Sequence, residues 1–155
     1  MGLMVIKRGK SLLSVGDVFA IPLRGRGYGF GRIIYMDGKW RLAEFFNNFK
    51  GDFTYTDDIV ESGRILPVHN IVTLAIESGE WPVIRREPDF VAKDIDNLLF
   101  YKGLRGSRSF LRVNGDSASY TEENAPPSAS SMPQFAEYIS DLLWEKFASE
   151  QGGGR

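Results

Sequence analysis

The sequence predicts a single β-rich domain of the α+β class, namely a strongly bent antiparallel sheet or small SH3-like barrel with one C-terminal amphipathic helix. Aromatic residues, which favour pleated strands, make up 13% of the 155 residues. The 17 glycines suit tight hairpins, because such turns need residues that tolerate positive φ. Only one segment, near the C-terminal end, has the apolar spacing of a long helix.

The first part of the chain predicts an antiparallel meander of three strands, at residues 17–23, 28–36 and 39–46. Asp37-Gly38, between the last two, is typical of a type I′ hairpin turn, which needs positive φ at both central residues. The meander begins the β-rich core, which we expect to span residues 16–113.

The middle of the chain predicts a loop and then shorter extended segments. Residues 47–63 are punctuated by Gly, Asn and Asp and read as a loop. Residues 64–76 are apolar and β-branched, which favours one or two strands near a sheet edge. We expect another extended segment at 81–84 and a hairpin that pairs 98–102 with 109–113. Residues 90–97 fit either a short helix or a loop.

Residues 132–149 predict the C-terminal helix. Its apolar side chains recur at three-and-four spacing and would line one face: Phe135, Tyr138, Ile139, Leu142, Leu143 and Phe147. Ser131 with Gln134 fits a capping box at its start. Residues 114–131, rich in Ser, Ala, Pro and Glu, are expected to form a flexible connector between the β-rich core and this helix.

Charge and composition narrow the class of protein. Nineteen basic residues against twenty acidic ones argue against a dedicated nucleic-acid binder, which normally carries a basic footprint. The chain has no cysteine, which excludes disulfides and thiolate metal sites. Residues 1–10 lack the pattern of a secretory signal, and no apolar stretch approaches the roughly 20 residues that span a bilayer. We therefore expect a cytoplasmic protein without membrane contact.

The residues that enzymes use are sparse. His69, the single histidine, stands in an apolar segment and fits a hydrogen-bonded core or edge residue better than a general base. Asp57 and Asp58 are adjacent, so in an extended strand they would point to opposite faces. The sequence contains no nucleophile elbow or phosphate-binding loop. We expect no enzymatic activity, no cofactor and no metal.

Two motifs resemble the immunity protein 26 family. One is Gly-Asp-Val-Phe-Ala-Ile-Pro-Leu at 16–23 with Tyr-Gly-Phe-Gly-Arg-Ile-Ile at 28–34, and the other is Ser-Gly-Glu-Trp-Pro-Val-Ile at 78–84. The resemblance covers roughly the first half of the chain. It implies an immunity protein of a bacterial polymorphic toxin system, which binds a cognate toxin domain and neutralises it.

The signature residues of these motifs are expected to be structural. They are Gly16, Asp17, Pro22, Gly29, Phe30, Gly31, Arg32, Trp81 and Pro82. A glycine inside a strand usually marks a close backbone approach or a bend, and Asp17 can cap the turn into the first strand. A toxin-specific surface should instead lie in the loops, where sequence variation is tolerated.

The loop at 50–61 is our candidate partner-binding surface. It joins carboxylates to aromatics: Asp52, Phe53, Tyr55, Asp57, Asp58 and Glu61. Carboxylates would steer the loop to the cationic active site of a nuclease toxin, while aromatics would anchor it. The alternative is that Phe53 and Tyr55 cover the core and the acids are merely solvated.

A second function class is a nucleic-acid-binding small barrel that uses the basic hairpin at 102–112. Cationic residues alternate there with aromatics that can stack on bases: Tyr101, Lys102, Arg105, Arg108, Phe110 and Arg112. The acidic loop and the near-neutral total charge count against this class. The sequence does not indicate an oligomeric state.

Overall fold

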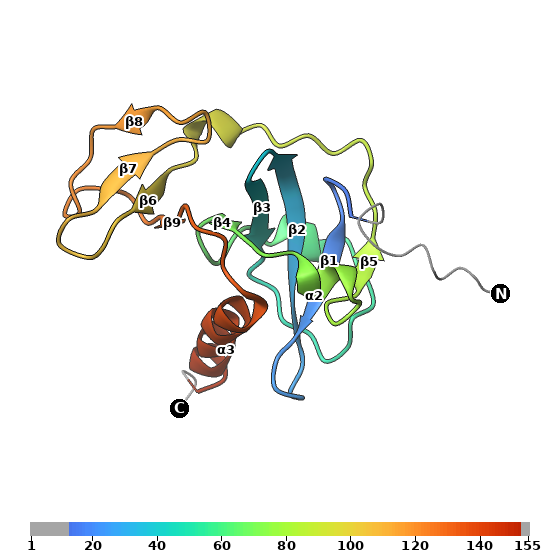
Figure 1. Cartoon of the computed structure of the whole chain (residues 1–155). Coiled ribbons are helices and arrows are strands. Elements are labelled where there is room, and N and C mark those ends of the chain that lie inside the picture. The colour runs from blue at the N-terminus through green and yellow to red at the C-terminus, as the bar shows by residue number, and fades with distance from the viewer. Residues whose placement is uncertain (1–12, 153–155) are drawn as a thin grey trace.

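A computed structural model describes residues 13–152 of the chain. Residues 1–10, which we expected not to be a secretory signal, lie outside this range. Figure 1 shows one main antiparallel sheet with a C-terminal helix beside it and a second, smaller sheet. The main sheet has five strands in the order β4-β3-β2-β1-β5. Its strands are β1 Val18–Pro22, β2 Tyr28–Asp37, β3 Trp40–Phe45, β4 His69–Asn70 and β5 Val83–Arg85.

These observations confirm the β-rich class, in its open-sheet form rather than as a closed barrel. The β2–β3 hairpin is also confirmed, but its predicted turn type is wrong. Asp37 pairs with Trp40, so Gly38 and Lys39 are the central residues of the turn. Gly38 has a φ of 56°. Among the non-glycine residues of the described range, only Arg24 has a positive φ, so the φ of Lys39 is not positive. Positive φ at the first central position alone is the pattern of a type II′ turn.

The two faces of the main sheet bury different side chains because alternate residues of a strand point to opposite faces. On one face, Phe19 and Ile21 of β1 pack with Phe45 of β3. On the other face, Ala20 of β1 and Phe30 of β2 lie opposite each other in the register and share a second cluster. The sheet is thus buried on both sides, and different segments cover each side.

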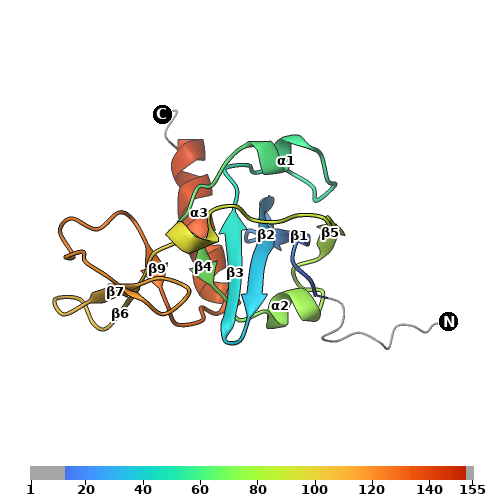
Figure 2. The same ribbon diagram turned by 90° about the horizontal axis from the view of Figure 1, so that it is seen from above.

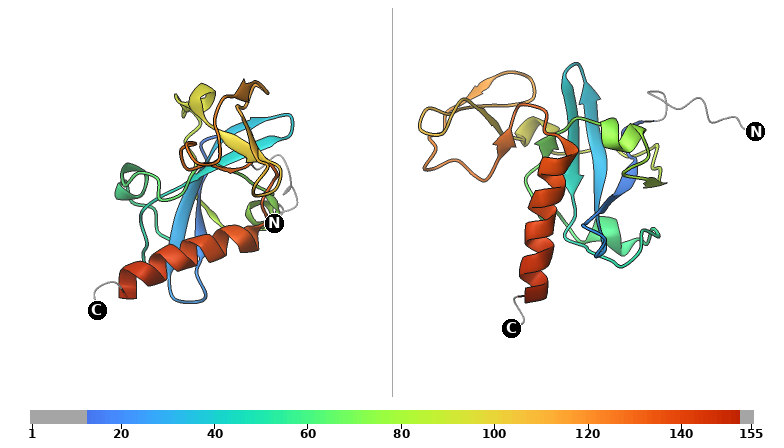
Figure 3. Two further views of the ribbon diagram at one scale, coloured as in Figure 1. Left: turned by 90° about the vertical axis from the view of Figure 1, so that its left-hand side faces the viewer. Right: turned by 60° about the horizontal axis from the view of Figure 1, so that its bottom comes forward.

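The helix α3, Ala136–Gly152, covers the first face (Figure 3). Ile139 and Leu143, two of the residues predicted on the apolar face of the helix, are fully buried against the sheet. Phe135 and Tyr138, predicted on the same apolar face, are instead 69% and 46% exposed. No helix in the described range is long and apolar enough to cross a bilayer.

The helix begins four residues later than predicted, and the proposed capping box is absent. The Gln134 N–H donates to the Asn70 carbonyl, and the Val72 N–H donates to the Gln134 carbonyl. The Ser131 N–H donates to Tyr101. These bonds hold the segment before α3 extended beside the end of β4, so it is not available for a helical turn.

The middle of the chain contains three short helices that join the strands: α1 Asp58–Glu61, α2 Leu74–Glu77 and η3 Ile95–Asn97. The prediction of one or two edge strands in 64–76 is confirmed by β4, which lies at the edge of the main sheet and has isolated β-bridges on either side at Arg64 and Ile71, but it is wrong from Leu74 onward, where α2 forms. In α2 the Ile76 and Glu77 N–H groups donate to the Thr73 carbonyl, and Gly79 ends the turn with a φ of 87°. Local turn bonds override the β-branched composition here.

The second sheet has four short strands in the order β8-β7-β6-β9: β6 Phe100–Lys102, β7 Ser109–Leu111, β8 Ser117–Ala118 and β9 Ala129–Ser130. The predicted β6–β7 hairpin is present. Residues 114–131, expected to be a flexible connector, supply β8 and β9. Figure 2 shows the second sheet beside the main one. Trp40 of β3 connects the two sheets, because its ring lies 5.0 Å from that of Phe100 and its indole N–H donates to the Val113 carbonyl at 3.0 Å.

Candidate partner-binding surfaces

Residues 55–60 of the loop at 47–63 pack on the face of the main sheet that α3 leaves uncovered, near α1 in Figure 2. Phe49, earlier in the loop, packs on the α3 side, with its ring centroid 5.4 Å from that of Phe147. Lys50 forms a β-bridge with Tyr28, which ties the loop to the start of β2. Ile59 of α1 is fully buried and packs with Phe30, and Tyr55 packs partly buried against the same cluster. The loop therefore supplies part of the core rather than hanging outside the meander.

Asp58 is held by its own neighbours. Its carboxylate accepts hydrogen bonds from Thr56, from Asn48 and from the Lys50 ammonium, the last at 2.9 Å. The Thr56 bond, followed by those of Lys50 and Asn48, lowers the pKa of Asp58 well below its usual value. Asp57 and Asp58 open the helical turn α1 instead of lying in an extended strand, so the predicted opposite orientation does not apply.

The other predicted loop residues divide into two groups. Tyr55 is half-buried, with the Arg85 guanidinium 4.7 Å above its ring, and burial raises the pKa of its hydroxyl. Phe53 is 46% exposed and meets the Tyr28 ring edge-on at 5.2 Å. The three remaining acids, Asp52, Asp57 and Glu61, are exposed, as is Asp58. We refer to Asp52, Phe53, Asp57 and Glu61 as the loop surface.

The signature residues lie at close approaches. A Cβ on Gly31 would stand 2.8 Å from both the Glu44 carbonyl and the Phe19 ring, as a close-approach glycine requires. The Asp17 carboxylate accepts the Ser14 N–H at 2.9 Å, which is the turn-capping bond expected of it. Trp81 stacks on Phe19 with ring centroids 5.5 Å apart.

The remaining signature residues are mostly packed as well. Phe30 is fully buried, and Gly16 could not carry a side chain, because its Cβ would lie 2.1 Å from the Glu87 carbonyl. The Pro82 carbonyl accepts the Ala20 N–H at 2.9 Å, whereas Pro22 is exposed at the end of β1. Apart from Pro22, these residues therefore lie at turns or packing contacts of the main sheet.

Arg32 is the centre of a largely buried ion cluster. It pairs directly opposite Glu44 in the register, and its guanidinium binds that carboxylate at 2.7 Å and the Glu87 carboxylate at 2.8 Å. Glu44 is only 5% exposed and also binds Arg64 at 2.8 Å. Arg64 continues to Asp94 at 2.7 Å, and its hydrogen bonds lower the pKa of Asp94.

The ring of Phe90 covers this cluster, with the Arg32 guanidinium carbon 3.9 Å from the ring centroid. The sequence resemblance marked Arg32 but none of its partners. Their spacing along the chain, from residue 32 to residue 94, gives no periodic signal. Only the fold shows that they form one cluster.

His69 is 4% exposed at the edge strand β4, and its Nδ1 lies 2.7 Å from the Pro67 carbonyl. Because a carbonyl only accepts, Nδ1 carries the hydrogen. Burial lowers the pKa of His69 and keeps the ring neutral. This geometry places the imidazole in the core, as the sequence suggested. In the described range, no group of three His, Asp or Glu side chains is arranged to hold a metal ion.

The basic hairpin of the second sheet forms part of a hollow. Arg105, Arg108, Tyr101 and Phe110 line it together, whereas Lys102 and Arg112 do not. The Arg112 guanidinium instead donates to the Asn97 carbonyl at 3.1 Å. Of the cationic and aromatic residues that the sequence singled out in this hairpin, four therefore converge.

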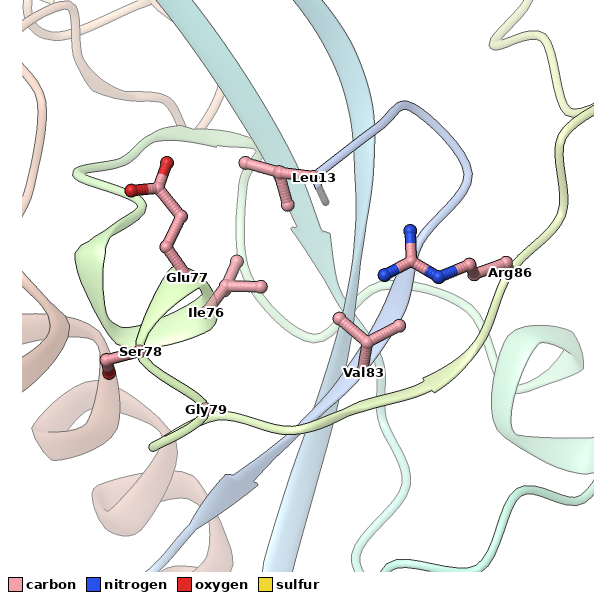
Figure 4. Close-up of a pocket in the computed structure, with 7 residues that line it drawn as sticks. All are labelled: Leu13, Ile76, Glu77, Ser78, Gly79, Val83 and Arg86. Atoms are coloured by element: carbon pink, nitrogen blue, oxygen red, sulfur yellow. The ribbon is translucent and has the colours of Figure 1, made fainter. Parts of the chain in front are cut away.

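A separate pocket of about 260 Å³ opens between α2 and β5. Figure 4 shows Glu77 and Arg86 reaching its rim around Leu13, Ile76 and Val83. Both charged groups already have partners within the chain. The Glu77 carboxylate accepts a hydrogen bond from the Thr73 hydroxyl at 2.8 Å, and the Arg86 guanidinium pairs with the Asp17 carboxylate at 3.0 Å. The pocket offers no catalytic constellation.

A comparison with protein families finds a match to the model of immunity protein 26 over residues 14–110. The chain belongs to the immunity protein 26 family. No curated protein and no solved structure matches it significantly. The family match spans the main sheet, the loop and the β6–β7 hairpin up to Phe110. The strands β8 and β9 and the helix α3 of this immunity protein 26 member lie outside the matched range.

Proposed function

We propose that the chain is a non-catalytic immunity protein that binds a cognate bacterial toxin in the cytoplasm and thereby neutralises it. Membership of the immunity protein 26 family across residues 14–110 is the observation that supports this function. The buried neutral imidazole of His69 and the internal pairing of the charged groups in the pocket of Figure 4 are compatible with a binding role.

The loop surface is the part of the molecule that we propose to contact the toxin. It offers an exposed aromatic, Phe53, beside three exposed carboxylates on a loop whose base is packed into the core. A loop held in this way loses little conformational entropy on binding. Its carboxylates complement a cationic cleft, such as one that holds a nucleic-acid backbone, and would accelerate association.

The test uses the toxin encoded by the gene next to that of this chain, because immunity genes of such systems sit beside their toxin genes. Asp52→Asn, Asp57→Asn and Glu61→Gln are combined in one variant. The matched control changes three exposed acids elsewhere, Glu123→Gln, Glu145→Gln and Glu150→Gln, so that both variants have the same net charge.

We expect the loop variant to associate about tenfold more slowly than the control and with a flatter dependence on salt. Phe53→Ala should mainly speed dissociation, by a factor that corresponds to about 1–2 kcal/mol or more. Stopped-flow or surface-based kinetics at two ionic strengths measure these rates. Equal rates in loop variant and control would remove this surface from the interface, and a toxin that the wild-type chain fails to bind would refute the function itself.

A further inference from the structure

The hollow on the second sheet is a built feature of the fold. Its volume is about 440 Å³, and its walls are Tyr101, Arg105, Arg108, Phe110, Glu122, Ala125, Pro126, Pro127 and Ser128. The hairpin β6–β7 and the segment between β8 and β9 thus supply all its lining residues. Phe110 is 6% exposed at its base. A partner group that entered here would meet aromatic, proline and guanidinium surfaces together.

Within the described residues, Arg105 and Arg108 lack the carboxylate partners that five other arginines of the chain have. Five arginines form ion pairs with carboxylates: Arg24, Arg32, Arg64, Arg85 and Arg86. Neither Arg105 nor Arg108 pairs with a carboxylate of residues 13–152. The Nε of Arg108 is moreover buried, with no hydrogen-bond partner among the described residues. Because this Nε has almost no accessible surface, a ligand would bind the other guanidinium nitrogens of Arg108.

The position of the Arg108 guanidinium is fixed. Its central carbon lies 3.8 Å from the centroid of the Tyr101 ring. Glu122 holds the turn between β6 and β7, because its Oε2 accepts hydrogen bonds from the backbone N–H groups of Gly106 at 2.8 Å and Arg108 at 2.9 Å. The cationic group is therefore pre-organised, which reduces the entropy lost when a ligand binds.

We propose that this hollow binds the carboxylate of an Asp or Glu side chain of the toxin, an inference that rests on the proposed function. A guanidinium is planar and matches a carboxylate with two parallel hydrogen bonds. The hollow has two arginines and one glutamate, so its net charge of +1 is balanced by one carboxylate. Tyr101, Phe110 and the prolines would cover the aliphatic stem of the same side chain.

The charge pattern around the hollow favours a protein ligand over a nucleic acid. Residues 99–131 carry four basic side chains and three acidic ones, the latter being Asp116, Glu122 and Glu123. A nucleic-acid backbone repeats its negative charge and is bound by runs of Lys and Arg. Here the three acids leave the segment a net charge of only +1, which suits a single carboxylate better than a repeating phosphate backbone.

The first experiment needs no toxin and uses benzoate as the probe, because it joins a carboxylate to an aromatic ring. The arginine Nε–Hε signals of the full chain are followed by NMR during titration. We expect saturable shifts of Arg105 and Arg108 at millimolar benzoate. Arg105→Gln and Arg108→Gln should abolish saturation, while Arg112→Gln, whose guanidinium bonds to Asn97 outside the hollow, should retain it.

Arg108→Gln also removes the stacking on Tyr101, so the exposed Arg105 provides the variant that is independent of the local fold. Inorganic phosphate and a single-stranded oligonucleotide are titrated in parallel. Stronger binding of either than of benzoate would overturn the carboxylate assignment and favour the nucleic-acid class. The absence of a saturable shift with benzoate would overturn the proposal as well.

The second experiment measures toxin affinity. We expect Arg105→Gln to weaken binding about 10- to 100-fold, the range for loss of a charged hydrogen bond, and Arg112→Gln to leave it within about twofold. If the toxin binds wild type and Arg105→Gln equally well, this inference fails while the proposed function stands. If wild type does not bind the toxin at all, the proposed function fails.

Discussion

Gly31→Ala should destabilise the fold, and Gly29→Ala in the same strand should not. Both glycines belong to the signature motif, and both face the cluster that contains Phe19 and Leu143. At Gly31 a methyl group would stand 2.8 Å from the Glu44 carbonyl and 2.8 Å from the nearest atom of the Phe19 ring. At Gly29 the nearest atom, on Leu143, is 3.4 Å away, which is ordinary van der Waals contact.

The neighbours of Gly31 cannot move aside. The Glu44 carbonyl belongs to the backbone of β3, which is paired with β2. The Phe19 ring is fully buried and held between Trp81, 5.5 Å away, and Phe45, 6.2 Å away. Overpacking of this kind typically costs about 1–3 kcal/mol of unfolding free energy. At Gly29 the methyl group should be neutral, or should stabilise by about 0.4–1 kcal/mol through a less flexible unfolded chain.

Urea unfolding of the two variants and of wild type, followed by tryptophan fluorescence, measures their differences in unfolding free energy. For a chain of 155 residues, 1 kcal/mol shifts the melting temperature by about 2–4 °C, so Gly31→Ala should melt roughly 2–12 °C lower. The m-values should agree, because the unfolded surface is unchanged. Two variants of equal stability would refute the view that Gly31 is required by close packing.

Two further predictions concern α3 and β4. Leu143→Ala should lower the unfolding free energy by about 2–5 kcal/mol, because Leu143 is fully buried, whereas the exposed Lys146→Ala should change it by less than about 0.5 kcal/mol. The lowered pKa of His69 means that the unfolded state binds the proton first. Stability should therefore fall as pH drops below about 6.5, by at most about 1.4 kcal/mol per pH unit. Unfolding curves between pH 5.5 and 7.5 should lose this slope in His69→Asn, and an unchanged slope would contradict the assignment.

Much of the main sheet could be predicted because its signals are local. Alternation and a turn signal specify β1, β2 and β3, whose observed bounds lie within one residue of those expected. Residues 74–76 were misjudged because local turn bonds to the Thr73 carbonyl form α2, and residues 131–135 were misjudged because distant partners decide their conformation. The Asn70 carbonyl takes the Gln134 N–H and delays α3. No spacing rule reveals a bond between residues so far apart in the sequence.

In the candidate surfaces, too, the features that are continuous in sequence could be predicted, and the contacts between separate residues could not. Composition found the acidic–aromatic loop and the cationic hairpin, since both are continuous in sequence. It did not show that, of the two exposed neighbours Asp57 and Asp58, the carboxylate of Asp58 is the one bonded to Lys50 and Asn48. Nor did it include Glu122, which holds the turn that carries Arg108. Affinity depends on such distinctions, since a carboxylate already paired has less charge to offer a partner.

The ion cluster around Arg32 connects the main sheet to the segments that pack beside it, namely the loop and the residues before η3. Arg64, which follows the loop, binds Glu44 on β3 and Asp94 before η3. Arg85 binds Glu87 and also covers the ring of Tyr55 in the loop. Buried ion pairs contribute little net stability, because desolvation offsets their attraction, but they require specific geometry. We infer that the cluster fixes the loop relative to the sheet, so that the loop surface is formed before a partner arrives.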